Sequence, residues 1–193
     1  MTESLVTLPQ LEASLRQRVA DSRVAAGDGH RTASVYVLFQ DPSTGPSVLL
    51  IKRANDLGQH RGEWAFPGGV MEDCDTTLLD CARRELEEEL GVAAADVDQW
   101  GELRPVSTRS GYLVWPFTGR LAEDTPIRPS SREVADVVTV PVSSLADRSS
   151  WRTISQLQGG SVRQTDAYAY EGRVIWGATA RILSEVLEVI SAA

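Results

Sequence analysis

The stretch that decides the fold begins with Phe66-Pro67-Gly68-Gly69 and continues, after a gap, with Arg84-Glu85-Leu86-Glu87-Glu88-Glu89-Leu90-Gly91-Val92. It joins a glycine turn to a segment with helical periodicity. At about 100° per residue, Glu85, Glu88 and Glu89 fall on one stripe of the predicted helix, beside an apolar stripe. Clustered carboxylates repel one another, and Mg²⁺ or Mn²⁺, which prefer oxygen ligands, can hold them together. Because such cations commonly meet phosphate, the stretch predicts metal-assisted phosphate chemistry.

The predicted helix has start and stop signals. One of residues 75–77 can cap its start, and Gly91 stands where a left-handed residue ends a helix. Arg84 precedes Glu88 by one helical turn and can pair with it. A solvated charged face is the alternative interpretation of this run. The metal site is favoured because the carboxylates border the apolar stripe, which is formed by Leu79, Ala82, Leu86 and Leu90.

These residues resemble the Nudix box, the signature of the Nudix hydrolases. That pattern is a glycine, five residues, an acid, seven residues and then Arg-Glu-apolar-x-Glu-Glu-x-Gly-apolar. Here Gly69 is followed by five residues, Asp75 and then eight residues before Arg84, and the second half matches at every fixed position. The resemblance implies an α/β fold of the Nudix type, an α/β/α sandwich with a mixed β-sheet between helices.

The resemblance also implies roles for the residues of the box. The matching acids of the family, here Glu85, Glu88 and Glu89, bind divalent metal, and the backbone carbonyl at Gly68 often joins them. Either Glu88 or Glu89 is the candidate for orienting or deprotonating the attacking water. Arg84 would orient a glutamate through a salt bridge. The implied cofactor is Mg²⁺ or Mn²⁺, and the implied activity is pyrophosphohydrolysis.

Within the family, the aspartate and the longer spacing resemble the coenzyme A pyrophosphatase branch. That branch carries two leucines, a threonine, any residue, an arginine and then serine or alanine before the box. Here Leu49-Leu50-Ile51-Lys52-Arg53-Ala54 matches, except that Ile51 replaces the threonine. Gly58 stands where the branch has arginine, and His60 or Arg61 is the candidate to replace that arginine. The implied reaction converts coenzyme A or its thioesters to 3′,5′-ADP and 4′-phosphopantetheine species.

Candidate substrate-binding residues also lie outside the box. Arg53 and Lys52 can meet the diphosphate or a 3′-phosphate, or remain strand-end cations in solvent. Many Nudix enzymes use an acid from a late loop, and Glu133, before a predicted strand, is either such an acid or a surface residue. Tyr112 and Trp115 can stack a base or belong to the core.

Other functions remain open from the sequence. The departures at Ile51 and Gly58 leave room for the same chemistry on ADP-ribose, a dinucleotide or a nucleoside triphosphate. A Nudix-fold binding protein without turnover is a further alternative. The intact set of Arg84, Glu85 and the two later glutamates argues against it, because such proteins usually lose acids from the box.

The composition limits which binding partners and which cellular location the protein can have. With 193 residues, a net charge of −8 and a pI of about 4.8, the chain is unsuited to a nucleic-acid backbone and fits a small-molecule substrate. Cys74 and Cys81 would lie roughly 10 Å apart on a helix, too far for a disulfide. No apolar stretch approaches the roughly 20 residues that cross a bilayer, and a secretory signal is lacking. We expect no membrane partner and a cytoplasmic protein.

The chain is expected to form a helical arm over residues 1–30, which makes a homodimer plausible, and a Nudix domain over residues 31–193. Apolar runs predict strands at 33–40, 48–52, 98–106, 112–121 and 134–140. Further predictions are helices over residues 9 to about 23 and 176–190, a helical turn at 141–145, and a hairpin or lid over 155–173.

Overall fold

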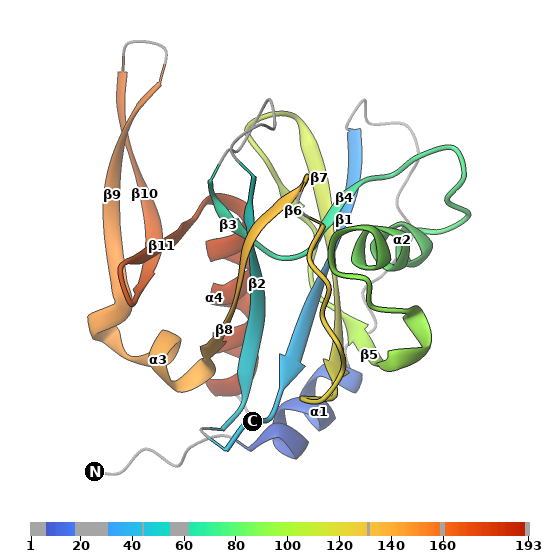
Figure 1. Cartoon of the computed structure of the whole chain (residues 1–193). Coiled ribbons are helices and arrows are strands. Elements are labelled where there is room, and N and C mark those ends of the chain that lie inside the picture. The colour runs from blue at the N-terminus through green and yellow to red at the C-terminus, as the bar shows by residue number, and fades with distance from the viewer. Residues whose placement is uncertain are drawn as a thin grey trace.

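The structure is a computed structural model that describes residues 7–17, 31–43, 45–54, 62–130, 132–158 and 161–191. A mixed β-sheet forms its centre (Figure 1). Its path runs β3-β2-β1-β7-β5, with β4 on β1, β6 on β7 and β8 on β2. β1 and β7 pair in parallel, whereas the other pairs are antiparallel. The strands are β1 (Arg31–Gln40), β2 (Ser47–Arg53), β3 (Trp64–Ala65), β4 (Gly68–Val70), β5 (Val97–Glu102), β6 (Val106–Ser107), β7 (Tyr112–Leu121) and β8 (Val134–Pro141).

Helices cover both faces of this sheet, because its central strands are apolar on both sides. Along β1, Val37 and Phe39 pack with α1 (Leu8–Arg16) and α4 (Gly177–Ser191). Tyr36 and Leu38 alternate to the other face, where α2 (Leu78–Leu90) lies. Figure 1 shows α2 and α4 on opposite sides of the sheet. The expected α/β/α sandwich with a mixed sheet is confirmed.

The described N-terminal helix is α1, from Leu8 to Arg16. The sequence predicted a helix from residue 9 to about residue 23, and the last part of that prediction lies outside the described residues, which omit 18–30. Leu8, Leu11 and Leu15 are buried in the core cluster that includes α4. Arg16 also holds the carboxylate of Asp98 at 2.6 Å. This helix therefore packs onto the body of the molecule.

The predicted strand over residues 98–106 is two strands, β5 and β6. Between them Leu103 donates its N–H to the Pro116 carbonyl at 2.9 Å, and Arg104 donates to the carboxylate of Glu185 on α4. Pro105 has no N–H to offer a sheet ladder. The segment therefore leaves the sheet for α4 before it returns as β6.

A second, three-stranded antiparallel sheet follows the short helix α3 (Val142–Ala146). It consists of β9 (Trp151–Gln158), β10 (Ser161–Tyr170) and β11 (Arg173–Trp176). The predicted hairpin over 155–173 exists, but β9 begins at Trp151 and a third strand is added. The β10–β11 turn places Glu171 and Gly172 at φ of 47° and 77°, the backbone of a tight hairpin turn. Glu-Gly is a weak signal for that turn, so the sequence did not reveal it.

Two 3₁₀ turns, η1 (Ala94–Asp96) and η2 (Arg148–Ser150), complete the described elements. Among the described helices, none combines the length and the hydrophobicity that a bilayer crossing requires.

Candidate metal and active site

The helix α2 is fixed at both ends by its own sequence. The Thr77 hydroxyl accepts the Asp80 N–H at 3.1 Å, and the Asp80 carboxylate accepts the Thr77 N–H at 3.0 Å. Gly91 ends the helix at φ of 64°. Ala82, Leu86 and Leu90 are fully buried against the sheet, so the stripe of acids lies along the edge of this contact.

The glycine turn lets backbone approach both β1 and α2. A Cβ on Gly68, whose φ is 148°, would stand 2.2 Å from the Ser34 carbonyl oxygen. A Cβ on Gly69 would stand 2.3 Å from Oε1 of Glu85. β4 pairs with β1 in this register, with Gly68 opposite Val35. Glycine is required here because any side chain would collide with the sheet or with the acidic stripe.

Three carboxylates meet beside this turn. Glu85 and Glu89 of α2 and Glu133, before β8, each offer an oxygen, and these oxygens lie within 4.8 Å of one another. The Glu133 carbonyl accepts the Ala54 N–H at 2.8 Å, which ties this residue to the end of β2. Sequence reasoning had Glu133 as a candidate loop acid, and the structure brings it to the helix acids.

Glu89 is the most buried of these acids, with 1% of the residue exposed. Its Oε2 accepts the Gly68 N–H at 2.8 Å, and its Oε1 faces Arg53 Nη1 at 3.6 Å. Burial raises the pKa of Glu89 to about 8, and the neighbouring charges of Glu85 and Glu133 add to the rise. The Gly68 hydrogen bond and Arg53 oppose this rise without cancelling it.

Arg84 organises the outer side of the cluster. It forks onto Asp75 with two bonds of 3.0 Å and reaches Glu85 at 2.9 Å and Glu88 at 3.0 Å. The predicted Arg84–Glu88 pair is therefore confirmed. The fork holds the pKa of Asp75 below its usual value. Sequence reasoning had Asp75 as the acid of the box and as one of three candidate caps, and it missed this pairing, for which the signal was the arginine nine residues later.

The donor set fits a hard divalent cation. All three ligand groups are carboxylates, which suit Mg²⁺ and Mn²⁺. Burial also raises the pKa of Glu85, so two of the three acids stand where the ionised form is disfavoured. A cation would remove that penalty for both.

The remaining candidates are not members of the carboxylate cluster, and they lie at different distances from it. Glu88 has 54% of its side chain exposed and is not among the described acids that form the cluster. Lys52 follows Leu50 toward the α4 side of β2, whereas Arg53 reaches the α2 side. Trp115 is buried in the core at 4% exposure, and Tyr112 lies under the Arg31 guanidinium. Arg61, with Gly58 and His60, lies outside the described residues.

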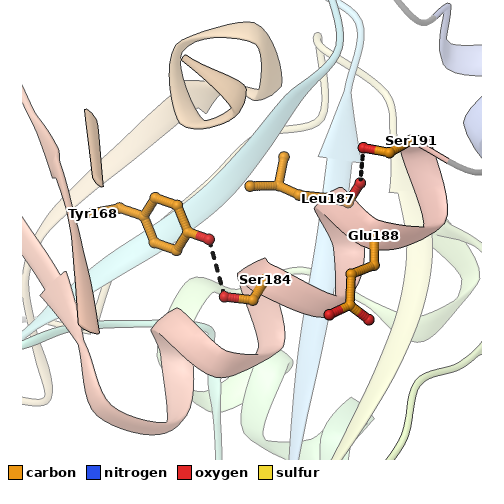
Figure 2. A pocket seen from close by; sticks show the side chains of 5 residues that line it. All are labelled: Tyr168, Ser184, Leu187, Glu188 and Ser191. Atoms are coloured by element: carbon orange, nitrogen blue, oxygen red, sulfur yellow. Dashed lines mark hydrogen bonds between the residues drawn. The ribbon is translucent and has the colours of Figure 1, made fainter. Parts of the chain in front are cut away.

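A hollow of about 460 Å³ lies on the α4 side of the sheet, away from the acids of α2. Figure 2 shows the Tyr168 hydroxyl directed at Ser184, and their oxygens are 3.0 Å apart. Leu187, Glu188 and Ser191 complete its lining. The carboxylate cluster and this hollow are therefore separate features, and only the cluster carries groups suited to a metal.

The fold and the carboxylate cluster define a hydrolase of the Nudix fold class, and comparisons with known proteins agree. The NUDIX domain model matches residues 30–157. The Nudix hydrolase NudL of Photorhabdus laumondii is 33% identical over 164 residues, which cover 84% of this chain and 87% of that protein.

Solved structures share the architecture. The Nudix hydrolase RenU from M. smegmatis has a TM-score of 0.57 at 21% identity, covering 85% of this chain and 88% of that chain. A MutT/nudix family protein from Enterococcus faecalis has a TM-score of 0.58 at 18% identity, covering 96% and 70%. The chain belongs to the Nudix hydrolase family and is a pyrophosphohydrolase, and enzymes of this family generally use divalent metal ions.

Proposed function

We propose that the protein hydrolyses the diphosphate bond of a nucleoside diphosphate linked to a second group, with coenzyme A or its thioesters as the first substrate. The observation that carries the diphosphate chemistry is the meeting of Glu85, Glu89 and Glu133 within 4.8 Å beside the glycine turn. The preference for coenzyme A rests on the segment 49–54 before the box, on the aspartate at position 75 and on the longer spacing after it.

In this proposal, Glu85, Glu89 and Glu133 hold Mg²⁺ or Mn²⁺. The cation supplies Lewis-acid neutralisation of the diphosphate charge. Gly68 keeps Glu89 in place through its N–H, and Arg84 keeps Glu85 in place through its guanidinium. These contacts preorganise the ligand oxygens before substrate arrives.

We assign Glu88 the role of accepting the proton of the attacking water. Its side chain is 54% exposed, compared with 12% for Glu85 and 2% for Glu89, so of the three it is the helix acid that solvent reaches most readily. Its Oε2 shares Arg84 Nη1 with Glu85, which fixes the Glu88 carboxylate beside the cluster. A carboxylate held at the edge of a metal site can serve as a general base.

The test is product formation with Mg²⁺ and with Mn²⁺, resolved by chromatography. The substrates are coenzyme A, ADP-ribose, NADH and a nucleoside triphosphate, and wild type is compared with Glu89→Gln. Glu87→Gln is the matched control, because Glu87 is an exposed acid of the same helix. We expect 3′,5′-ADP from coenzyme A with wild type and Glu87→Gln, and its loss with Glu89→Gln.

Turnover of another diphosphate while coenzyme A stays intact would contradict the substrate assignment and leave the site assignment standing. That outcome favours the alternative substrates, which the departures at Ile51 and Gly58 leave open. Lack of turnover across the panel with both metals would contradict the catalytic proposal.

A further inference from the structure

Among the described residues, Arg53 and Arg84 border the carboxylate cluster, and they are held differently. Arg84 is bonded to carboxylate and carbonyl oxygens at 2.9 to 3.1 Å. Arg53 Nη1 stands 3.6 Å from Glu89 Oε1, beyond the roughly 2.7–2.9 Å of a charge-assisted hydrogen bond. Arg84 is thus locked in place, whereas Arg53 provides charge near Glu89 without a close bond to it.

The backbone of Arg53 is fixed by hydrogen bonds, whereas among the described residues its side chain makes only the longer contact with Glu89. Its N–H donates to the Glu63 carbonyl at 3.0 Å, and its own carbonyl accepts the Gly62 N–H at 3.0 Å. The next N–H, from Ala54, bonds to the carbonyl of Glu133. The Arg53 side chain therefore leaves a fixed backbone next to Glu133. The guanidinium can move away from Glu89 by rotation of this side chain alone.

Arg53 and a divalent cation compete for the same oxygen. Oε2 of Glu89 already accepts the Gly68 N–H, and Oε1 is the oxygen that Arg53 faces. A cation held by Glu85, Glu89 and Glu133 would meet the positive charge of Arg53 at close range. Like charges repel strongly in a partly buried site, and Arg53, unlike Arg84, has no close bond to a carboxylate of the cluster among the described contacts, so a cation at Glu89 disfavours the present position of the Arg53 guanidinium.

We propose that Arg53 is a built-in counter-cation for Glu89 that the metal displaces, and that the displaced guanidinium then binds the diphosphate of the substrate. This inference rests on the proposed function for the identity of the anion. The planar guanidinium, with its side chain 28% exposed, is suited to fork onto phosphate oxygens at the mouth of the cluster.

The exchange couples the two ligands. Metal alone must push Arg53 away, which weakens metal binding in the absence of substrate. The diphosphate neutralises both Arg53 and the metal, so each ligand improves the binding of the other. Metal binding thereby prepares the phosphate site.

The experiment titrates Mn²⁺ alone into substrate-free protein by calorimetry at pH 9, where proton competition for Glu89 is small. The KM at saturating Mn²⁺ is then measured with whichever diphosphate of the panel turns over. Arg53→Gln removes the charge, Arg53→Lys keeps the charge but loses the fork, and Arg120→Gln is the control. Arg120 is an exposed arginine of β7, so its loss matches the charge change.

We expect Arg53→Gln to bind Mn²⁺ about fivefold more tightly than wild type and its KM to rise about 10- to 100-fold. Arg53→Lys should bind Mn²⁺ like wild type and still show the raised KM, because an ammonium cannot fork. Arg120→Gln should match wild type in both measurements.

Weaker or unchanged Mn²⁺ binding in Arg53→Gln would overturn the displacement, since a purely supporting arginine would loosen the site on removal. An unchanged KM would overturn the contact with the diphosphate. The Mn²⁺ titration needs no substrate, so failure of coenzyme A as a substrate leaves this test intact.

Discussion

Glu89 couples three parts of the molecule through one side chain. It closes onto the glycine turn through Gly68, faces Arg53 on β2, and contributes an oxygen to the cluster with Glu85 and Glu133. Because the carboxylate is buried, its charge depends on what stands next to it. The chemistry at this residue therefore responds both to metal and to pH.

Changing Glu88 and Glu89 to glutamine should affect catalysis and metal binding differently. Glu88→Gln should lower kcat about 10²- to 10⁴-fold, the range for losing a general base, with Mn²⁺ affinity nearly unchanged. Glu89→Gln should lose Mn²⁺ affinity, by more than the about 10- to 100-fold typical of residues that only support a ligand. Calorimetry and steady-state kinetics on both variants measure this difference. Equal losses of metal affinity would contradict the separate roles.

Metal binding should tighten as pH rises through about 8, because Glu89 must lose its proton to bind a cation. Mn²⁺ titrations in buffers of different ionisation enthalpy would detect the released proton. Glu89→Gln should show neither the proton release nor this pH dependence. A flat affinity between pH 6 and pH 9 in wild type is the contrary outcome.

Glu89 also contributes to the pH dependence of stability without metal. The folded pKa lies above the unfolded value of 4.5, so the folded state binds more protons than the unfolded state between the two values. The EDTA-treated protein should lose stability as pH rises from about 4.5 toward 8. Melting curves across this range, for wild type beside Glu89→Gln, would show the slope in wild type and a smaller one in the variant.

At the scale of elements, the turn at residues 66–69 and α2 form one unit. The turn contacts β1 on one side and Glu85 on the other, and each contact depends on a different glycine. These two glycines therefore have different structural and chemical roles.

Alanine at the two glycines should separate folding from catalysis. Gly68→Ala places its Cβ against the backbone of Ser34 and Val35, so the free energy of unfolding should fall by about 2 kcal/mol or more. Gly69→Ala meets only the end of the Glu85 side chain, which can move. That variant should stay folded and lose about 10- to 100-fold in kcat/KM. Urea melts and kinetics distinguish the two, and a folded Gly68→Ala of wild-type stability would contradict the contact.

Local signals predicted this unit well. The signals for α2 lie within the helix or directly beside it: the period of the acids, the capping residues and Gly91. The helix and its Arg84–Glu88 pair were therefore correctly predicted. The sequence left open whether Glu133 joins the cluster and whether Arg53 lies near Glu89. Glu133 and Arg53 reach Glu89 only because β2 and β8 pair in one register, and a single sequence does not reveal that register.

At the scale of the whole molecule, one sheet separates two different faces. The α2 face carries the acids, and the α1 and α4 face carries the larger core cluster. Sequence predicted both faces from the apolar run of β1. It did not predict β11, because a Glu-Gly turn gives little local signal, nor the early end of β5.

The N-terminal helix should contribute to the stability of the whole molecule. Leu11 is fully buried in the core cluster, so Leu11→Ala should lower the free energy of unfolding by about 2–4 kcal/mol. Val162→Ala, at a side chain that is 70% exposed on the β9–β10 hairpin, is the control and should stay within about 0.5 kcal/mol. Chemical denaturation measures both. If Leu11→Ala had the denaturation midpoint of the wild type, the packing of α1 would not contribute to the free energy of unfolding.

The buried position of Glu89 also bears on how long the protein survives in a cell. A chain deprived of divalent cations keeps an acid in an environment that disfavours its charge, so it opens more often. Proteases cleave chains in proportion to the time those chains spend open, and a change of one or two kcal/mol alters abundance several-fold. Metal starvation should thus shorten the lifetime of the enzyme as well as stop its reaction, and refeeding would reactivate the surviving chains at once but replace the lost ones only as fast as new chains are made.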